Sequence, residues 1–516
     1  MDNNGRSQWG SNIGFILAAV GSAVGLGNIW GFPYKMGKSG GFTFLLVYIA
    51  IAVLVGFIIM MSELALGRKT RLNPIGAYAN TAKKYTFLGW FAVLSPFLIM
   101  SFYSVLGGYC IQYLSLNLAE ASFGLQSAFG IALTGSNTFG AMLTNPFGCV
   151  VFTLLFMIIC YLINRGGVSE GIEKFNKIGM PALFVMLVIV IIRALTMEGA
   201  AEGLKFMFVP GYAVKAGFIS EAPSLINVLG TAGGQMFFSL SLAMGAMITY
   251  GSYLGEKEDI RKNSGVIVFA DTLVALMAGI AVIPAAVANG IQNGIAFSDI
   301  KLSGPNLLFV TLQNVFAEMG VVGPIFGVIF YALVLIAAIS SAISLIEVIS
   351  AYFIDRAAAK GKQSNRGKIV LLVCVAIMVE AALVAWDGLG SNGVWVPGQA
   401  QFGIKTFNDC WLDFMDCWSE GVMMPIGAMV MALLIGWELK PNFTLNELKN
   451  GTTYGKAFET FYSICIKVVV PIIMCFVTIG QLNDFFGTNV VNYVVSIAIL
   501  LFFFIMTFVG GMKKEK

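Results

Sequence analysis

The sequence contains no histidine, little charge and few long polar segments. Its 516 residues include 31 basic and 27 acidic side chains, so 11% are charged, against roughly a quarter in soluble domains. The absence of histidine excludes Ser-His-Asp and Cys-His catalysis and every histidine-ligated metal. The eight cysteines form no C-x-x-C pair, so we interpret them as small apolar side chains, with a disulfide or metal site at Cys410 and Cys417 as the alternative. The sequence therefore predicts a protein that is not an enzyme.

Apolar residues, in contrast, are abundant and occur in long runs. They make up 58% of the chain, and the mean hydropathy is +0.84. Runs of about 18 to 25 mostly apolar residues can cross roughly 30 Å of hydrocarbon as helices. Twelve such runs predict an all-α polytopic membrane protein with twelve transmembrane helices. The predicted spans are 11–34, 42–67, 87–118, 147–163, 172–196, 223–253, 263–290, 322–355, 368–387, 411–437, 460–482 and 488–511.

Lysine and arginine are concentrated in the segments that lie in the cytoplasm if both termini do, for example Arg68 and Lys69 after the second span. This bias predicts a multi-pass protein of the cell inner (plasma) membrane with both termini cytoplasmic. The first run is long and lacks an A-x-A-like cleavage site, so we interpret it as a retained span. The net charge of +4 is then an orientation signal, and we expect the lipid bilayer as a partner and no nucleic acid. The sequence leaves the oligomeric state open.

Two predicted spans contain residues that disfavour a continuous helix. Residues 21–34, GSAVGLGNIWGFPY, hold several glycines, and each lowers helix stability by about 1 kcal/mol. Freed carbonyls in hydrocarbon need protein, water or an ion as a partner, although small residues also permit close helix packing. A second such run, LGTAGGQMFFSLSLAMGAMITYGSY, occupies residues 229–253 of the sixth span. A separation of five spans favours inverted repeats whose broken helices 1 and 6 line an ion and substrate site.

We therefore predict a single membrane transport domain over residues 1–516. Spans 1–5 form a first repeat over 11–196, spans 6–10 form a second repeat over 223–437, and two additional spans lie within 460–511.

Four motifs in this order resemble the neurotransmitter:sodium symporter family, in particular its bacterial amino-acid transporters. They are GSAVGLGNIWGFPY (21–34), GGFTFLLVY (40–48), QMFFSLSLAMGAMITYGSY (235–253) and ISSAISL (339–345). The resemblance covers spans one to ten. It implies a symporter that imports a hydrophobic or aromatic amino acid, a small-molecule substrate, by alternating access with one or two Na⁺ ions. A sodium-sensitive receptor or channel on the same scaffold is the alternative from another functional class.

The resemblance implies two sodium sites made of hard oxygen ligands, which suit an alkali cation. The first would use Ala23, Asn28, Ser239 and, allowing one gap in the match, Asp271. An ionised carboxylate within a span is costly unless it is paired, so Asp271 predicts a fixed negative charge that replaces chloride. In the alternative, Asp271 lies near the cytoplasmic end of its span and is solvated. The second site would use the carbonyls of Gly21, Val24 and Ala337 and the hydroxyls of Ser340 and Ser341.

Gly25 bears on the substrate, because amine-transporting members of the family carry aspartate there. Glycine favours a ligand that brings its own carboxylate. The resemblance implies that N–H groups around Leu26 and Gly27 and the hydroxyl of Tyr103 hold this carboxylate. The implied substrate-binding residues are Gly25, Leu26, Gly27, Ile99, Phe102, Tyr103, Phe238, Ser241, Met244, Ile339 and Leu345.

Gate residues also follow from the resemblance, with two departures. Asp416 is present at the outer gate, but Gly31 stands where the family usually has its arginine partner, and Ala243 replaces the usual glycine after the break in span six. Both departures leave open a flat apolar substrate without a carboxylate, such as indole. Glu63 is expected to accept hydrogen bonds from the broken-helix backbone, with proton coupling as the alternative. The implied gate residues are Arg6, Trp9, Tyr253, Asp355 and Asp416.

Overall fold

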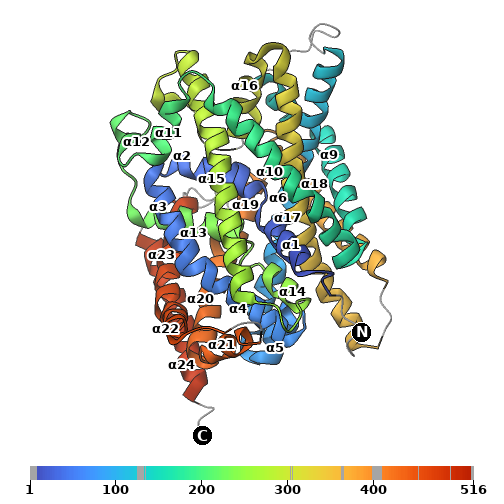
Figure 1. Cartoon of the computed structure of the whole chain (residues 1–516), viewed down its shortest axis with the longest axis vertical. Helices are drawn as coiled ribbons and strands as arrows, with labels where there is room; N and C mark the ends of the chain where they lie inside the picture. The colour runs from blue at the N-terminus through green and yellow to red at the C-terminus, as the bar shows by residue number, and fades with distance from the viewer. Residues whose placement is uncertain are drawn as a thin grey trace.

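The computed structural model of the chain describes residues 8–124, 133, 135–300, 302, 304, 306–361, 365–397, 410–450, 453–488 and 490–512. All regular elements within these ranges are helices, arranged as an upright bundle (Figure 1). Ten of them are long and apolar enough to cross a membrane, or eleven when the bent pair α1 and α2 counts as one span. The predicted all-helical membrane protein is confirmed.

The long helices follow the predicted apolar runs closely. They are α3 (Phe42–Ile51) with α4 (Phe57–Thr70), α6 (Thr86–Phe123), α9 (Pro146–Asn164), α10 (Lys174–Leu195), α15 (Ile260–Gln292), α17 (Gly323–Ala359), α18 (Arg366–Asp387), α19 (Trp411–Asp416) with α20 (Met424–Leu433), α22 (Lys456–Ile464) with α23 (Val470–Phe486), and α24 (Val490–Met512). Each of these paired helices continues through a π-helical turn, such as η8 (Cys417–Met423) between α19 and α20. Shorter helices connect them: α5 (Pro74–Thr81), α8 (Gly135–Leu143), α11 (Ala200–Phe208), α12 (Tyr212–Lys215), α16 (Leu312–Glu318) and α21 (Asn442–Leu448).

The first predicted span is broken, as its glycines indicate. Helix α1 (Asn12–Ala23) begins where the side chain of Ser11 accepts a hydrogen bond from the backbone of Gly14, and it ends at Val24, whose backbone is extended. The chain resumes as the π-helical turn η1 (Gly27–Gly31) and α2 (Phe32–Lys38), bent by 46° from α1.

The sixth predicted span is broken as well. Helix α13 (Leu225–Ser239) and helix α14 (Ala246–Ser252) are separated by six residues, 240–245. Three residues in this gap, Ser241, Ala243 and Gly245, have positive φ angles of 52°, 58° and 76°, which no helix accommodates. Each of the two helices is too short to cross a membrane alone, which accounts for the difference between the twelve predicted spans and the continuous spans found.

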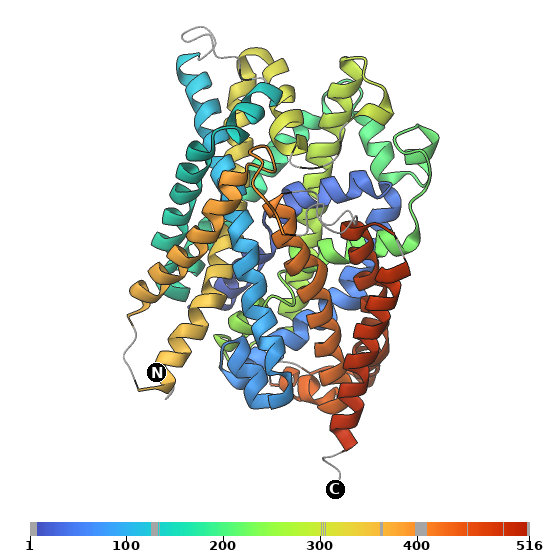
Figure 2. The same cartoon turned by 180° about the vertical axis from the view of Figure 1, so that it is seen from behind.

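The broken helices lie inside the bundle. Helix α1 packs against α10, α15 and α17, while α13 packs against α3 and α23, and α14 packs against α4. At the other extreme, only 17% of the apolar window of α24 is buried, and Figure 2 shows this helix at the edge of the bundle beside α23. Most of α24 is therefore exposed on the outside of the bundle, whereas protein encloses the freed backbone groups of the breaks, as hydrocarbon requires. The division into two inverted repeats stays a prediction.

Candidate ion and substrate site

Asp271 lies at the centre of the first cluster of polar groups, where α15 meets both broken helices. Its side chain is 0% exposed. Asn28 Nδ2 donates to Asp271 Oδ1 at 2.7 Å, and the hydroxyl of Ser239 lies 2.9 Å from Oδ1 and 3.0 Å from Oδ2. Tyr48 donates a longer hydrogen bond of 3.3 Å to Oδ2. The alternative in which Asp271 is solvated is therefore wrong.

The carboxylate of Asp271 has polar neighbours but no cationic one. In the described part of the chain, none of the ion pairs includes this residue. A buried carboxylate without a compensating cation is costly by several kcal/mol. Asn28 is itself fixed, because its Oδ1 accepts from the backbone of Gly25 at 3.0 Å. The carboxylate of Asp271 and the hydroxyl of Ser239 are hard oxygen donors of the kind that an alkali cation prefers, whereas the amide of Asn28 presents its nitrogen to Asp271.

A second cluster joins α1 to α17. The hydroxyl of Ser340 lies 3.3 Å from the carbonyl of Val24 and 2.8 Å from that of Ala337. The hydroxyl of Ser341 lies 3.3 Å from the carbonyl of Gly21. Each of the five oxygen donors expected for the second sodium site thus lies within hydrogen-bonding distance of another member of the set, in one group around Ser340 and one around Ser341.

A small cavity lies between the two clusters. Its lining residues are Ser22, Ala23, Gly25, Gly27, Ile99, Tyr103, Phe238, Ser241, Met244, Ser341 and Leu345. Most of the implied substrate-binding residues are in this set. Three are not: Leu26, Phe102 and Ile339 are buried nearby without lining the cavity. The Leu26 N–H nevertheless contributes at its edge, because it donates to the hydroxyl of Tyr103 at 3.0 Å.

Ser22 was not among the implied residues, although it connects α1 to α17 and to the break between α13 and α14. Its carbonyl accepts from Ser241 at 2.8 Å and from Ser341 at 3.0 Å, and its hydroxyl bonds to Ser344 at 2.8 Å. The only signal in the sequence was its place inside the glycine-rich run.

Glycine is required sterically at two positions of the cavity. A Cβ atom on Gly25 would lie 2.2 Å from Ser341 Oγ and 2.6 Å from the hydroxyl of Tyr103. A Cβ atom on Gly27 would lie 2.7 Å from the ring of Phe238. Any side chain at Gly25 would therefore displace groups of both the substrate cavity and the second cluster.

Glu63 holds the break in the sixth span, as expected from the sequence. Its Oε1 accepts from the backbone N–H of Ala243 at 2.7 Å. Ala243 does not line the cavity, so it does not narrow the space beside a ligand. A Cβ atom built on Gly427 would lie 3.9 Å from the methyl group of Ala243, so the alanine side chain faces that glycine.

Ala243→Gly is expected to stabilise the protein, because the φ angle of this alanine is 58° and a left-handed backbone costs an L-residue roughly 1–2 kcal/mol. Thermal unfolding in detergent should show a higher melting temperature. Ala246→Gly is the control: this alanine is fully buried and begins α14, so that glycine relieves no left-handed strain there and lowers helix stability. A melting temperature for Ala243→Gly at or below that of the unsubstituted protein would contradict the strain.

Residues of the implied inner gate lie around α14. Trp9 Nε1 donates to the carbonyl of Tyr250 at 3.1 Å, and its ring lies 6.3 Å from that of Tyr253. Asp355 accepts from the backbone and side chain of Asn73 at 2.8 and 2.9 Å, which ties α17 to the start of α5. Arg6 lies outside the described residues.

Beside these implied gate residues lies an ion pair that sequence reasoning missed. Tyr253 donates to Glu347 Oε1 at 2.8 Å, and Arg366 pairs with the same carboxylate. Because Arg366 Nε also reaches the carbonyl of Asn164 at 3.1 Å, this group connects α14, α17, α18 and α9.

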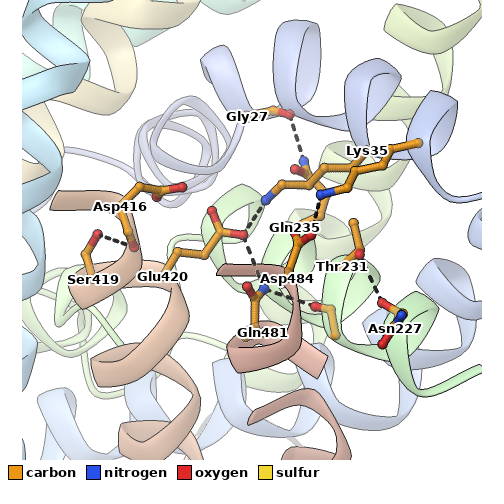
Figure 3. A network of polar contacts seen from close by, with 12 residues as sticks. Gly27, Lys35, Asn227, Thr231, Gln235, Asp416, Ser419, Glu420, Gln481 and Asp484 are labelled. Carbon is orange, nitrogen blue, oxygen red and sulfur yellow. Dashed lines mark hydrogen bonds and ion pairs between the residues drawn. The ribbon is translucent and has the colours of Figure 1, made fainter. Parts of the chain in front are cut away.

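The implied outer gate differs from its expected form. Asp416 Oδ1 is buried and accepts no hydrogen bond within the described residues. The ion pair at this end is made by Lys35 of α2 and Glu420 of η8, each one turn further along its helix than Gly31 and Asp416 (Figure 3). Lys35, Asp416 and Glu420 line a cavity of about 340 Å³, which we call the vestibule. Gly31 does not line it.

The sequence is similar to those of known sodium-dependent transporters. The sequence model of the "Sodium:neurotransmitter symporter family" matches residues 6–124 and 143–512. An uncharacterized sodium-dependent transporter of Bacillus subtilis (strain 168), YhdH, is 33% identical over 483 residues, which are 92% of this chain and 98% of that protein. An uncharacterized sodium-dependent transporter of Haemophilus influenzae is 30% identical over 491 residues, covering 93% of this chain and 99% of that protein.

A solved structure supports the same assignment. The crystal structure of MhsT in complex with L-phenylalanine matches with a TM-score of 0.78 and 34% identity, covering 92% of this chain and 100% of that chain. With the family match over most of its length, this chain belongs to the sodium:neurotransmitter symporter family and is a multi-pass, sodium-dependent membrane transporter.

Proposed function

We propose that the protein is a symporter that couples the import of a hydrophobic or aromatic amino acid to sodium and does not need chloride. The observation that carries this proposal is the buried carboxylate of Asp271 bonded to Asn28 and Ser239, beside the cavity between the broken helices. A carboxylate at this point supplies a permanent negative charge for a sodium ion, so that no anion is needed to balance it.

The cavity itself supports the choice of substrate class. Ile99, Phe238, Met244 and Leu345 form an apolar wall, and methionine adapts to ligands of several shapes. At the other side, the N–H of Leu26 donates to the hydroxyl of Tyr103 at 3.0 Å, and this hydroxyl lines the cavity, where its own hydrogen can be donated to a ligand carboxylate. The neighbour MhsT was crystallised with L-phenylalanine. The chemistry of this lining matches an amino acid with a bulky apolar side chain, and the cavity, which at about 10 Å³ holds roughly one water, must widen to admit it.

The two clusters suggest how transport proceeds. Sodium at Asp271, Asn28 and Ser239 would fix the break between α1 and α2 and complete one side of the cavity. Sodium at the second cluster would hold α1 against α17 through Ser340 and Ser341, and its release would free α1 from α17. Alternating access then follows because sodium and substrate bind one arrangement of the broken helices better than the other. With both termini in the cytoplasm, Trp9 and Asp355 lie at the inner gate.

The test is uptake of labelled L-phenylalanine by purified protein in vesicles with an inward sodium gradient. We expect accumulation above the outside concentration, no accumulation when potassium replaces sodium, and no change when gluconate replaces chloride. Leucine and tyrosine should compete. Uptake that only equilibrates would indicate a channel, and competition by indole alone would overturn the amino-acid assignment.

A further inference from the structure

The polar network at the vestibule has a centre that the family resemblance does not supply. The whole stretch from α1 through η1 to Tyr34 of α2 carries no charge, and Lys35 is the first charged residue after it. Lys35 Nζ pairs with Glu420 of η8, so the ion pair joins the outer half of the broken helix to the tenth predicted span (Figure 3).

The position of this lysine follows from the packing one turn earlier. A Cβ atom on Gly31 would lie 2.8 Å from Gln235 Oε1, and Gln235 is held there because its Nε2 donates to the carbonyl of Gly27 at 2.7 Å. Gln235 thus occupies the space that a side chain at position 31 would need. A residue four positions later points to the same face of a helix, and position 35 holds the lysine.

Glu420 is held from the opposite side by α23. Gln481 Nε2 lies 3.5 Å from Glu420 Oε1 and donates to the carbonyl of Gly230 at 3.0 Å. Gly234 of α13 makes room for both, since a Cβ atom there would lie 1.6 Å from Gln481 Nε2 and 2.5 Å from Glu420 Oε1. The eleventh predicted span therefore contributes directly to the network around the vestibule.

The Lys35–Glu420 ion pair is more deeply buried than the neighbouring ion pair. The side chains of Lys35 and Glu420 are 15% and 6% exposed, whereas those of the second ion pair, Lys38 and Asp484, are 43% and 30% exposed. Exposed ion pairs contribute little because water and salt screen them. Removing one partner of a largely buried pair is far more disruptive, because the other charge is left uncompensated.

We propose that the Lys35–Glu420 ion pair is the latch that closes the vestibule over the substrate cavity, and that Gln481 of α23 anchors its acidic side. The inference rests on the proposed function, because alternating access requires that α2 separate from η8 to admit a ligand. Lys35 moves with α2, while Glu420 stays bonded to Gln481. The latch breaks at one contact and reforms there in each cycle.

The test measures opening rather than transport. Thr231 lies on α13, lines the vestibule and is 5% exposed, so Thr231→Cys, in a background with Cys410→Ser, reports access through its rate of labelling by a membrane-impermeant maleimide. Lys35→Met and Glu420→Gln should raise this rate at least about tenfold. The charge swap Lys35→Glu with Glu420→Lys should restore slow labelling, as should the conservative Lys35→Arg. Gln481→Leu should raise the rate by a smaller factor.

Lys38→Met is the matched control. It removes the lysine of the exposed ion pair, which lies three residues after Lys35, and should leave labelling unchanged. Equal effects of Lys38→Met and Lys35→Met, or a charge swap that labels as fast as the single variants, would overturn the latch. Uptake by the unsubstituted protein is measured separately. Absent uptake with the expected labelling pattern rejects the proposed cargo but not the latch, whereas normal uptake with unchanged labelling rejects the latch alone.

Discussion

Asp271→Asn is expected to raise the sodium concentration for half-maximal uptake by at least about 100-fold, since breaking a buried charge pair costs about 3–5 kcal/mol and each 1.4 kcal/mol is a factor of ten. The substitution keeps the size of the side chain, but it removes the charge that faces Asn28 and Ser239 in a site that is 0% exposed. Uptake of L-phenylalanine over a range of sodium concentrations, at constant ionic strength, gives the measurement.

Asp387→Asn serves as the control for loss of a buried aspartate. Asp387 is also 0% exposed, but it accepts from the backbone of Gly390 and Trp411 at 3.1 and 3.0 Å, away from the cavity. Its replacement should affect stability without changing the sodium dependence. Asp271→Ser adds a second arm, because it leaves space for an anion: chloride should restore part of its uptake, and gluconate should not. Unchanged sodium dependence in Asp271→Asn would contradict the assignment of the first sodium site.

The helical fold was predictable because it depends on local sequence. Apolar runs of membrane length specify helices whatever their neighbours. The two breaks were predictable for a related reason: the run that begins at Gly21 and the run around Ser241 place glycine and polar groups where hydrocarbon penalises a freed backbone. Asp271 could also be recognised, because a carboxylate in an apolar run needs a partner.

The lateral contacts were not predictable to the same degree. Whether Phe102 or Ile99 lines the cavity depends on the rotation of α6, which the composition of that helix leaves open. The Lys35–Glu420 pair depends on the depth at which α2 and η8 meet, and the Arg366–Glu347 pair depends on how α18 approaches α17. Such contacts join residues far apart in the sequence, and no periodicity within one span encodes them.

Gly25→Ala is expected to abolish uptake of L-phenylalanine while leaving the protein folded. The added methyl group would lie 2.2 Å from Ser341 Oγ and 2.6 Å from the hydroxyl of Tyr103, distances that real Cβ contacts do not show. The two hydroxyls must therefore move, which disturbs Ser341 of the second cluster and the Tyr103 hydroxyl beside Leu26 at once. Binding of L-phenylalanine, measured as the shift in melting temperature with and without sodium, should disappear together with uptake.

Gly265→Ala provides the comparison, because the same methyl group on α15 would lie 3.8 Å from the ring of Phe57, which is ordinary van der Waals contact. This variant should bind and transport as the unsubstituted protein does. A sodium-dependent shift that persists in Gly25→Ala would mean that the ligand lies elsewhere than between Tyr103 and the broken first helix. Loss of the shift in Gly25→Ala alone would support a ligand that lies beside both clusters, because Gly25 donates to Asn28 of the first cluster and lies against Ser341 of the second.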